Sequence, residues 1–375
     1  MNKLLSLIFV SMLLVTLACS PQVKSTPTPP PSPALPASPA VTPGREDLAL
    51  QKLVEAAKKE GKVTLYTINF IGDAGIAIQS AFTERYGVKI DAISGRGAEF
   101  TERLKTEART KNQTGDYTEG SPLHLINMKK AGLTTTLADL PVLQEKDVWK
   151  LDIGYLDQDK HLLAYSPIFQ WPLVNTKLVK PEDEPKSWLD LLQPRWKGKI
   201  LFADPVIASN AYMAFQTLVK GGMITSDYLD KLGAQDLLQV IGPTQGVEAL
   251  SRGEAPIFLF TAASTATNAV RAGAPIKIID LKEGMSAQAN LMAVVKDSPH
   301  PNAAKLFANW LLSKEGQSVQ AKARGADGVR KDVPSGFPPA LALDPVRPVL
   351  TTSDDLETQG KMYQDKVYLP LLKKK

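Results

Sequence analysis

A short run of apolar and β-branched residues, Lys62-Val63-Thr64-Leu65-Tyr66, predicts a strand that is buried within a sheet. The pattern from about Asp73 to Tyr86 then predicts a helix, and Gly87 is a typical residue to end one. Val88 to Ile93 predicts a second strand. A strand, a helix and another strand in this order are typical of a parallel sheet covered by helices. This segment therefore predicts an α/β fold.

The same alternation continues along the chain and predicts two α/β units of comparable size, with a cleft between them. In open α/β sheets, ligands gather at the carboxyl ends of strands, where loops enter helices. We therefore expect functional residues just after Tyr66, Ile93, Ala203 and Phe260. Further helices are predicted at about 48–59, 98–111, 122–131, from 209, 264–272 and 302–312, and further strands at 199–203, 257–260, 276–281 and 291–296.

The amino-terminal segment has the features of a lipoprotein signal. An apolar run from Leu4 to Leu17 follows Asn2-Lys3, and it falls short of the roughly 20 residues that a membrane-spanning helix needs. Leu17-Ala18-Cys19 resembles the bacterial lipobox, and Cys19 is the only Cys in the chain. We expect a signal peptide at 1–18, a lipidated Cys19 and a Pro-rich tether at 19–45. The protein would then be extracytoplasmic and membrane-anchored, in the periplasm or on the outer face of the cell membrane.

Composition and motifs argue against several other classes of function. The 375 residues carry a formal net charge of +5, with the basic residues scattered except at the carboxyl end, which predicts no nucleic-acid binding. The chain has no Gly-x-Ser-x-Gly elbow, P-loop or His-Glu-x-x-His motif, so we expect no enzyme, no catalytic residue, no metal and no cofactor. His124 and His161 are expected to be surface or hydrogen-bonded structural residues. A surface lipoprotein without a transport role is an alternative.

Several stretches, taken in order, resemble one protein family. The most specific are His300–Leu306 and Leu311–Gln317, which accompany Gly61–Thr67, Ala81–Lys89 and Gly95–Leu104 in the first half, and Trp188–Pro205 in the second. They resemble the bacterial type II periplasmic solute-binding proteins of ABC importers, in the extracellular group related to ferric-iron-binding proteins. The resemblance covers about residues 48–334.

The resemblance implies an α/β fold of two lobes, each a mixed, largely parallel sheet flanked by helices, joined by a hinge that closes on a solute. It implies a first lobe from residues 46–171 plus 286–336, a second lobe from 172–285, and a segment 337–375 that packs on the lobes. The chain would cross between lobes near 165–175 and 281–290. A monomer would hand a small-molecule solute to the permease of an ABC transporter.

The residues directly after Phe260 bear on the identity of the solute. In ferric-binding relatives a pair of tyrosines is expected there, but this chain has Thr261-Ala262-Ala263-Ser264-Thr265 and no adjacent Tyr pair anywhere. Hydroxyls and free N–H groups at a helix start suit an anion, and Arg96 could bind a carboxylate or phosphonate through two hydrogen bonds. We therefore expect an organic anion, with ferric iron as the alternative.

Eleven residues are expected to bind the solute, although each hydroxyl could equally be a plain helix cap and each aromatic a core residue. They are Thr67, Arg96, Gly97, Ser121, Trp171, Ser209, Asn210, Tyr212, Thr261, Ser264 and Asn290.

Overall fold

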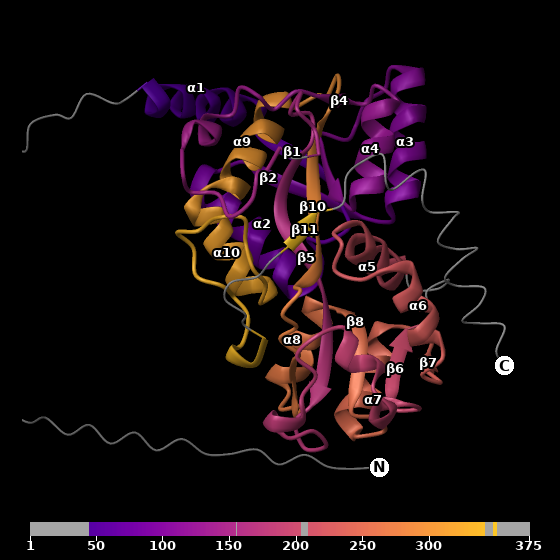
Figure 1. Cartoon of the computed structure of the whole chain (residues 1–375). Coiled ribbons are helices and arrows are strands. Elements are labelled where there is room, and N and C mark those ends of the chain that lie inside the picture. Colours follow the sequence, from indigo (N-terminus) through magenta and orange to yellow (C-terminus); the bar gives the residue numbers. More distant parts are fainter. Residues whose placement is uncertain (1–44, 155, 204–208, 342–347, 351–375) are drawn as a thin grey trace, which may run out of the picture. The chain divides into compact units, whose positions relative to one another are not determined.

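One continuous sheet, with eleven strands in the described residues, organises the protein (Figure 1). The structure is a computed structural model that describes residues 45–154, 156–203, 209–341 and 348–350. At one end of the sheet, the parallel strands β2 (Lys89–Ser94), β1 (Lys62–Thr67) and β3 (Tyr117–Gly120) lie in that order. At the other end, β8 (Ile257–Ala262), β6 (Ile200–Ala203) and β7 (Leu238–Val240) are again parallel.

Two long antiparallel strands join these ends of the sheet. β5 (Leu163–Asn175) and β10 (Met285–Val295) pair with each other, while β10 also pairs with β3, and β5 with β8. Three short strands, β4 (Thr134–Thr135), β9 (Ile276–Ile278) and β11 (Pro348–Leu350), complete the sheet beside β10 and β5. The result is a mixed sheet with parallel strands toward both ends and antiparallel strands in the middle.

Helices cover the sheet on both sides (Figure 1). At the first end, α1 (Arg45–Glu60), α2 (Gly72–Tyr86), α9 (Pro301–Leu312) and α10 (Lys314–Arg324) gather on one side, and α3 (Gly97–Thr110) and α4 (Pro122–Lys130) on the other. At the second end lie α5 (Ser209–Lys220), α6 (Ser226–Gly233), α7 (Pro243–Arg252) and α8 (Ala263–Arg271). No helix among the described residues combines the length and hydrophobicity that crossing a membrane requires.

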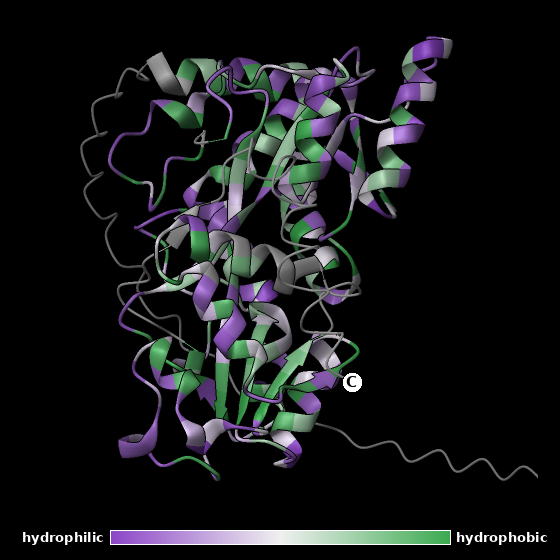
Figure 2. Cartoon of the chain, turned by 45° about the vertical axis from the view of Figure 1, so that its right-hand side comes forward, coloured by the Kyte–Doolittle hydropathy of each residue, from purple (hydrophilic) through white to green (hydrophobic). Residues whose placement is uncertain are grey.

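Buried side chains form separate hydrophobic cores at the two ends of the sheet. The first lobe is built around one core, in which the ring of Phe307 meets those of Phe82 and Tyr117 edge to face. The second lobe contains two adjoining cores, one around Phe260 and one around Phe258. β6 and β8 consist mainly of hydrophobic residues, whereas the covering helices alternate between polar and apolar residues (Figure 2). β5 and β10 each contribute side chains to the cores of both lobes.

Helix ends follow from the residue types that occupy them. Gly87 ends α2 and Gly325 ends α10, with φ of 72° and 57° respectively, in the left-handed region that glycine adopts without steric cost. Pro301 opens α9, where its missing N–H would have no partner within the helix. α2 (Gly72–Tyr86) and α9 (Pro301–Leu312) therefore begin and end close to the expected residues.

Three details of the sequence-based prediction were wrong. β10 begins at Met285 and not at Leu291. The prediction missed its first half because this half carries buried polar residues, which do not show the apolar pattern of a buried strand. Thr261 does not open a helix, since it lies in β8 and is fully buried. The sequence Ser187-Trp188-Leu189-Asp190 resembles a capping box and predicts a short helix, but the segment forms only a 3₁₀ turn, Leu189–Leu192. The expected signal peptide, Cys19, nearly all of the tether and most of the carboxyl-terminal segment lie outside the described residues.

Candidate functional site

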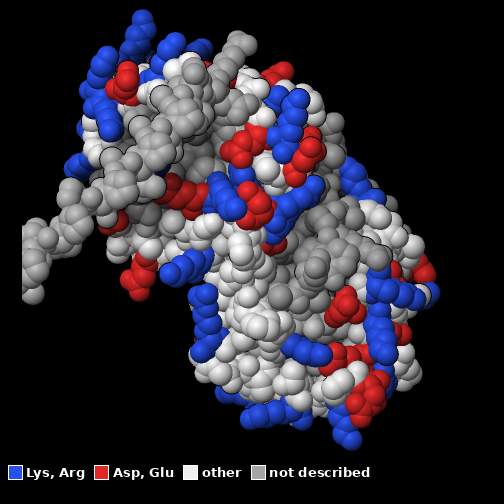
Figure 3. Space-filling view, turned by 90° about the vertical axis from the view of Figure 1, so that its left-hand side faces the viewer, with Lys and Arg blue, Asp and Glu red and all other residues white. Residues whose placement is uncertain are grey.

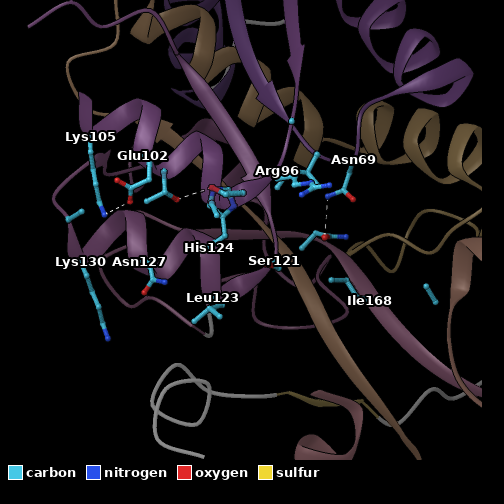
Figure 4. A pocket seen from close by; sticks show the side chains of 18 of the residues that line it. Asn69, Arg96, Glu102, Lys105, Ser121, Leu123, His124, Asn127, Lys130 and Ile168 are labelled. Atoms are coloured by element: carbon cyan, nitrogen blue, oxygen red, sulfur yellow. Dashed lines mark hydrogen bonds and ion pairs between the residues drawn. The ribbon is translucent and has the colours of Figure 1, made fainter. Parts of the chain in front are cut away.

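A cleft of about 1030 Å³ opens at the carboxyl ends of β1, β2, β3 and β8 (Figure 4). The loop after β1 contributes Asn69, and Arg96 and Ser121 precede α3 and α4. From the second lobe, Ser264 lies in the first turn of α8. The cleft therefore lies where three of the four expected strand ends meet; the loop after Ala203, residues 204–208, lies outside the described residues.

A fully buried carboxylate, Glu119, holds the loop after β1 in place beneath the cleft. One oxygen accepts hydrogen bonds from the Thr67 hydroxyl and from the backbone N–H groups of Ile68 and Asn69, at 2.7, 2.7 and 2.8 Å. The other oxygen accepts from the Asn69 side chain and, at 2.7 Å, from the Tyr165 hydroxyl. A buried charge is stable only when its acceptors are filled in this way. Glu119 therefore fixes the position of Asn69.

A β-bulge directs two side chains of the connecting strands toward this network. The register between β5 and β10 shifts at Asn290/Leu291, so that Tyr165 has no partner residue across the ladder. The Asn69 amide donates to the Tyr165 hydroxyl at 3.0 Å and to the Asn290 side-chain oxygen at 3.3 Å. Burial, followed by the charge of Glu119, raises the pKa of Tyr165 well above its usual range, so its phenol stays protonated.

The starts of α3 and α4 form the opposite wall of the cleft. Arg96 is exposed, and its backbone N–H donates to the Glu99 carboxylate at 3.2 Å. Ser121 is the N-cap residue of α4, and its hydroxyl caps no N–H group of that helix. A Cβ at Gly97 would lie only 2.7 Å from the ring of His124, so glycine is required for the loop and α4 to pack this closely. The first N–H groups of an α-helix have no partner within the helix, so a helix start that borders a cleft favours a negatively charged group there.

His124 lines the cleft but is neither a surface residue nor a hydrogen-bonded one, contrary to the prediction. It is 8% exposed, and both ring nitrogens are buried without a hydrogen-bond partner among the described residues. Burial lowers the pKa of His124 to about 4, and the nearby Glu119 only partly opposes this shift. The ring is therefore neutral at pH 7.

Basic side chains predominate among the described residues that line the cleft. They include Arg96, Lys105, Lys130 and Arg324, whereas Glu102 is the one acid, and its carboxylate lies 2.8 Å from the Lys105 ammonium. On the face shown in Figure 3, acidic and basic side chains are interspersed. The lining favours a solute with negative charge.

The predicted binding residues separate into three groups. Arg96, Gly97, Ser121, Ser264 and Asn290 all line the cleft. Thr67 and Thr261 are buried in the strands behind it, and Trp171 is buried in a core of the second lobe, stacked on Phe169 with ring centroids 5.7 Å apart. The side chains of Ser209, Asn210 and Tyr212 lie outside the described part of the structure.

Sequence reasoning missed Asn69, Glu119, Tyr165 and Arg324. Asn69 lies within the loop after Tyr66, where functional residues were expected. A polar amide side chain in that loop was the signal that could have identified it. The other three act through contacts between segments that are far apart in the sequence.

The arrangement offers no evident metal centre. No group of three or more His, Cys, Asp or Glu in the described residues could hold a metal ion, and no tyrosine is among the described residues that line the cleft. The cleft presents N–H, hydroxyl, amide and guanidinium groups, which are hydrogen-bond donors suited to anionic oxygen.

Known proteins resemble the chain over most of its length. Residues 77–348 match the sequence model of a family described as bacterial extracellular solute-binding protein. An uncharacterized protein of Haemophilus influenzae is 30% identical over 258 residues, which cover 64% of this chain and 70% of that protein. A Salmonella typhi periplasmic protein named for 2-aminoethylphosphonate binding is 26% identical over 291 residues, or 73% of this chain and 80% of that protein.

Solved structures share the fold. Iron-bound HitA from Pseudomonas aeruginosa superposes with a TM-score of 0.64 at 21% identity, covering 82% of this chain and 99% of that chain. The predicted type II periplasmic-binding fold is thereby confirmed. The fold alone does not select a ligand, because the names of these similar proteins specify solutes as different as iron and a phosphonate.

Proposed function

Because the chain belongs to the bacterial extracellular solute-binding proteins, we propose that it binds a small organic anion, a carboxylate or a phosphonate, and delivers it to an ABC importer. The observation that carries this proposal is the cleft lining, with four basic side chains and one acid that is already paired. Oriented donors on a rigid scaffold favour a negatively charged group.

The two lobes are proposed to close on the solute by bending where β5 and β10 pass between their cores. Asn69 and Arg96 from the first lobe and Ser264 from the second line the same cleft. A solute that touches both lobes binds the closed form better than the open one, and this difference in affinity drives closure. A closed protein would then present its solute to the permease.

Membrane attachment is proposed through a lipid on Cys19, which follows Leu17 and Ala18. We expect that Cys19→Ser, expressed in a bacterium, releases the protein from the membrane fraction and abolishes incorporation of labelled fatty acid. Membrane fractionation with fatty-acid labelling measures both. Retention of label in Cys19→Ser would contradict the assignment.

Isothermal titration against a panel of solutes tests the proposed ligand class. Methylphosphonate, 2-aminoethylphosphonate, succinate and citrate represent organic anions, and ferric iron, arginine and glucose represent other classes. At least one organic anion should bind with 1:1 stoichiometry and raise the melting temperature, as binding to the folded state requires. Tight binding of ferric iron with a phenolate absorption band, and no binding of any organic anion, would overturn the proposal.

A further inference from the structure

The helix α10 is docked onto the β-bulge at the centre of the molecule. The side-chain amides of Gln317 and Gln320 both donate to the backbone oxygen of Tyr165, at 3.0 and 3.2 Å. This carbonyl belongs to the residue that the bulge leaves out of the ladder, so α10 supplies the missing hydrogen bonds. Residues three and four positions apart share one face of a helix. Arg324 therefore continues the face that Gln317 and Gln320 present to the bulge.

Arg324 reaches the cleft from this face with part of its guanidinium unsatisfied. It lines the cleft, and its Nη1 atom is buried without a hydrogen-bond partner in the part of the chain that the structure describes. Burial and Glu119 both raise the pKa of Tyr165. The positive charge of Arg324 has a smaller effect, which lowers that pKa. More than nine in ten buried polar groups in folded proteins have a partner, so an unpaired guanidinium nitrogen beside a binding cleft calls for one.

The nearby buried carboxylate is not that partner. Glu119 already accepts five hydrogen bonds, from Thr67, Ile68, Asn69 twice and Tyr165. Arg324 also forms none of the ion pairs found among the described residues, unlike Arg330, which is paired with Glu145 and Asp332. The charge of Arg324 is thus left available for a group that enters the cleft.

We propose that Arg324 is the principal contact for the anionic group of the solute and the residue that sets the preference for anions. This inference rests on the proposed function and names the side chain that decides it. A guanidinium presents parallel N–H donors that match the oxygens of a carboxylate or phosphonate. Because its inner nitrogen is already removed from water, the pair forms where electrostatic attraction is strongest.

Arg96 has a different role in the same cleft. It is exposed at the start of α3, where water and salt screen its charge. Exposed charges at a binding site mainly accelerate association, whereas buried charge pairs mainly slow dissociation. The two arginines therefore allow a matched comparison between a charge that accelerates association and a charge that slows dissociation.

The test measures affinity and rates for Arg324→Gln, Arg324→Lys and Arg96→Gln, with Arg252→Gln, at an exposed position at the end of α7, as the control. The probes are methylphosphonate, 2-aminoethylphosphonate, succinate and inorganic phosphate, followed by calorimetry and stopped-flow fluorescence. Arg324→Gln should weaken binding about 10- to 100-fold, mainly through faster dissociation. Arg96→Gln should change affinity about threefold or less and slow association, most clearly at low salt.

The outcomes separate the two proposals. If the unaltered protein binds none of the probes, the proposed function fails and the role of Arg324 falls with it. If it binds a probe and Arg324→Gln binds that probe as tightly as Arg252→Gln does, the role of Arg324 alone is overturned. Circular dichroism checks that each variant folds. Should Arg324→Gln not fold, Arg324→Lys decides, because it keeps the charge without the planar donors and should lose about tenfold in affinity.

Discussion

Glu107 shows how strongly one buried side chain can depend on its neighbours. Its carboxylate accepts hydrogen bonds from the Tyr66 and Thr114 hydroxyls, from Arg103 at 2.9 Å and from the Thr114 and Gly115 N–H groups. Burial alone would raise the pKa of Glu107, but hydrogen bonds from Thr114, Tyr66 and Arg103 outweigh it and lower the pKa to about 2. The ionised form is therefore tied to the folded state.

This dependence predicts the effect of Glu107→Gln on stability. Because the folded pKa of about 2 lies below the ordinary pKa of 4.5, the carboxylate stabilises the fold fully above pH 4.5, and the effect is lost as pH falls toward 2. At pH 7, Glu107→Gln should lower the free energy of unfolding by on the order of 2–3 kcal/mol, and the deficit should shrink below pH 4.5. Urea denaturation at pH 7, 4 and 3 measures it.

Glu102→Gln on the same helix is the matched control. Glu102 is exposed, and among the described residues its carboxylate pairs only with Lys105, so this substitution should change stability by less than about 0.5 kcal/mol. Equal stability of Glu107→Gln and Glu102→Gln at pH 7 would contradict the role of the Glu107 network.

The sequence could predict the site residues that act from loops next to strand ends, and not those that depend on distant contacts. Arg96 and Ser264 were found because a helix begins beside each of them after a predicted strand, and Ser121 because it precedes a predicted helix. Glu119 looks like an ordinary strand-end acid until the loop after β1 and the middle of β5 are brought to it. Its role is decided by three segments meeting in space, which no local pattern encodes.

At the scale of elements, the end of α10 is fastened to α8. The hydroxyl of Thr267 donates to the Gly325 backbone oxygen at 3.1 Å, and a Cβ at Gly325 would lie 2.6 Å from the Arg271 guanidinium. The glycine thus serves two purposes at one position. It adopts a left-handed conformation, and it allows a helix of the first lobe to approach one of the second.

Gly325→Ala should therefore cost more than the same change at another helix end. Gly87 also ends its helix in the left-handed region, but a Cβ there would meet nothing within 4 Å. We expect Gly87→Ala to cost about 1 kcal/mol from backbone strain alone, and Gly325→Ala about 2–3 kcal/mol because Arg271 and Thr267 must also move. Chemical denaturation of both variants measures the difference, and equal costs would show that the contact with α8 is dispensable.

Elements were predictable where burial and hydrophobicity coincide. β1, β6 and β8 are short buried runs of apolar residues, and each was expected within about two residues of its place. β10 was only half recognised, because Ser286, Gln288 and Asn290 are buried although polar. Their burial depends on pairing with β5, which the sequence of β10 alone does not reveal.

At the scale of the whole molecule, neither lobe is complete without strands that it shares with the other. β5 contributes Leu163 to the core of the first lobe and Leu173 to a core of the second, while β10 contributes Val294 and Ala287. Unfolding one lobe would strip pairing partners and core residues from the other. We therefore expect the described part of the chain to unfold as one cooperative unit.

Hydrogen exchange can test this cooperativity with a substitution confined to one core. Phe307→Leu removes ring contacts with Phe82 and Tyr117 in the first lobe and should cost about 1–2 kcal/mol. The most protected amides of β8, in the second lobe, should lose as much protection as those of α9, as judged by mass spectrometry. The reciprocal variant, Phe258→Leu, alters a core of the second lobe, and the most protected amides of α9 should then lose as much protection as those of β8. Loss confined to the altered lobe would refute a single unit.

The shared strands also determine how the lobes can move. The ladder between β5 and β10 continues from Ser286 to Met292, interrupted only by the shift beside Asn290. Rotation of one lobe against the other must therefore change the twist of a hydrogen-bonded two-stranded ribbon. Such a ribbon resists twisting elastically, unlike a flexible linker. If the lobes close on a solute as proposed, such a ribbon would return toward its resting twist when released, and we expect the protein to reopen by recoil once the solute has left.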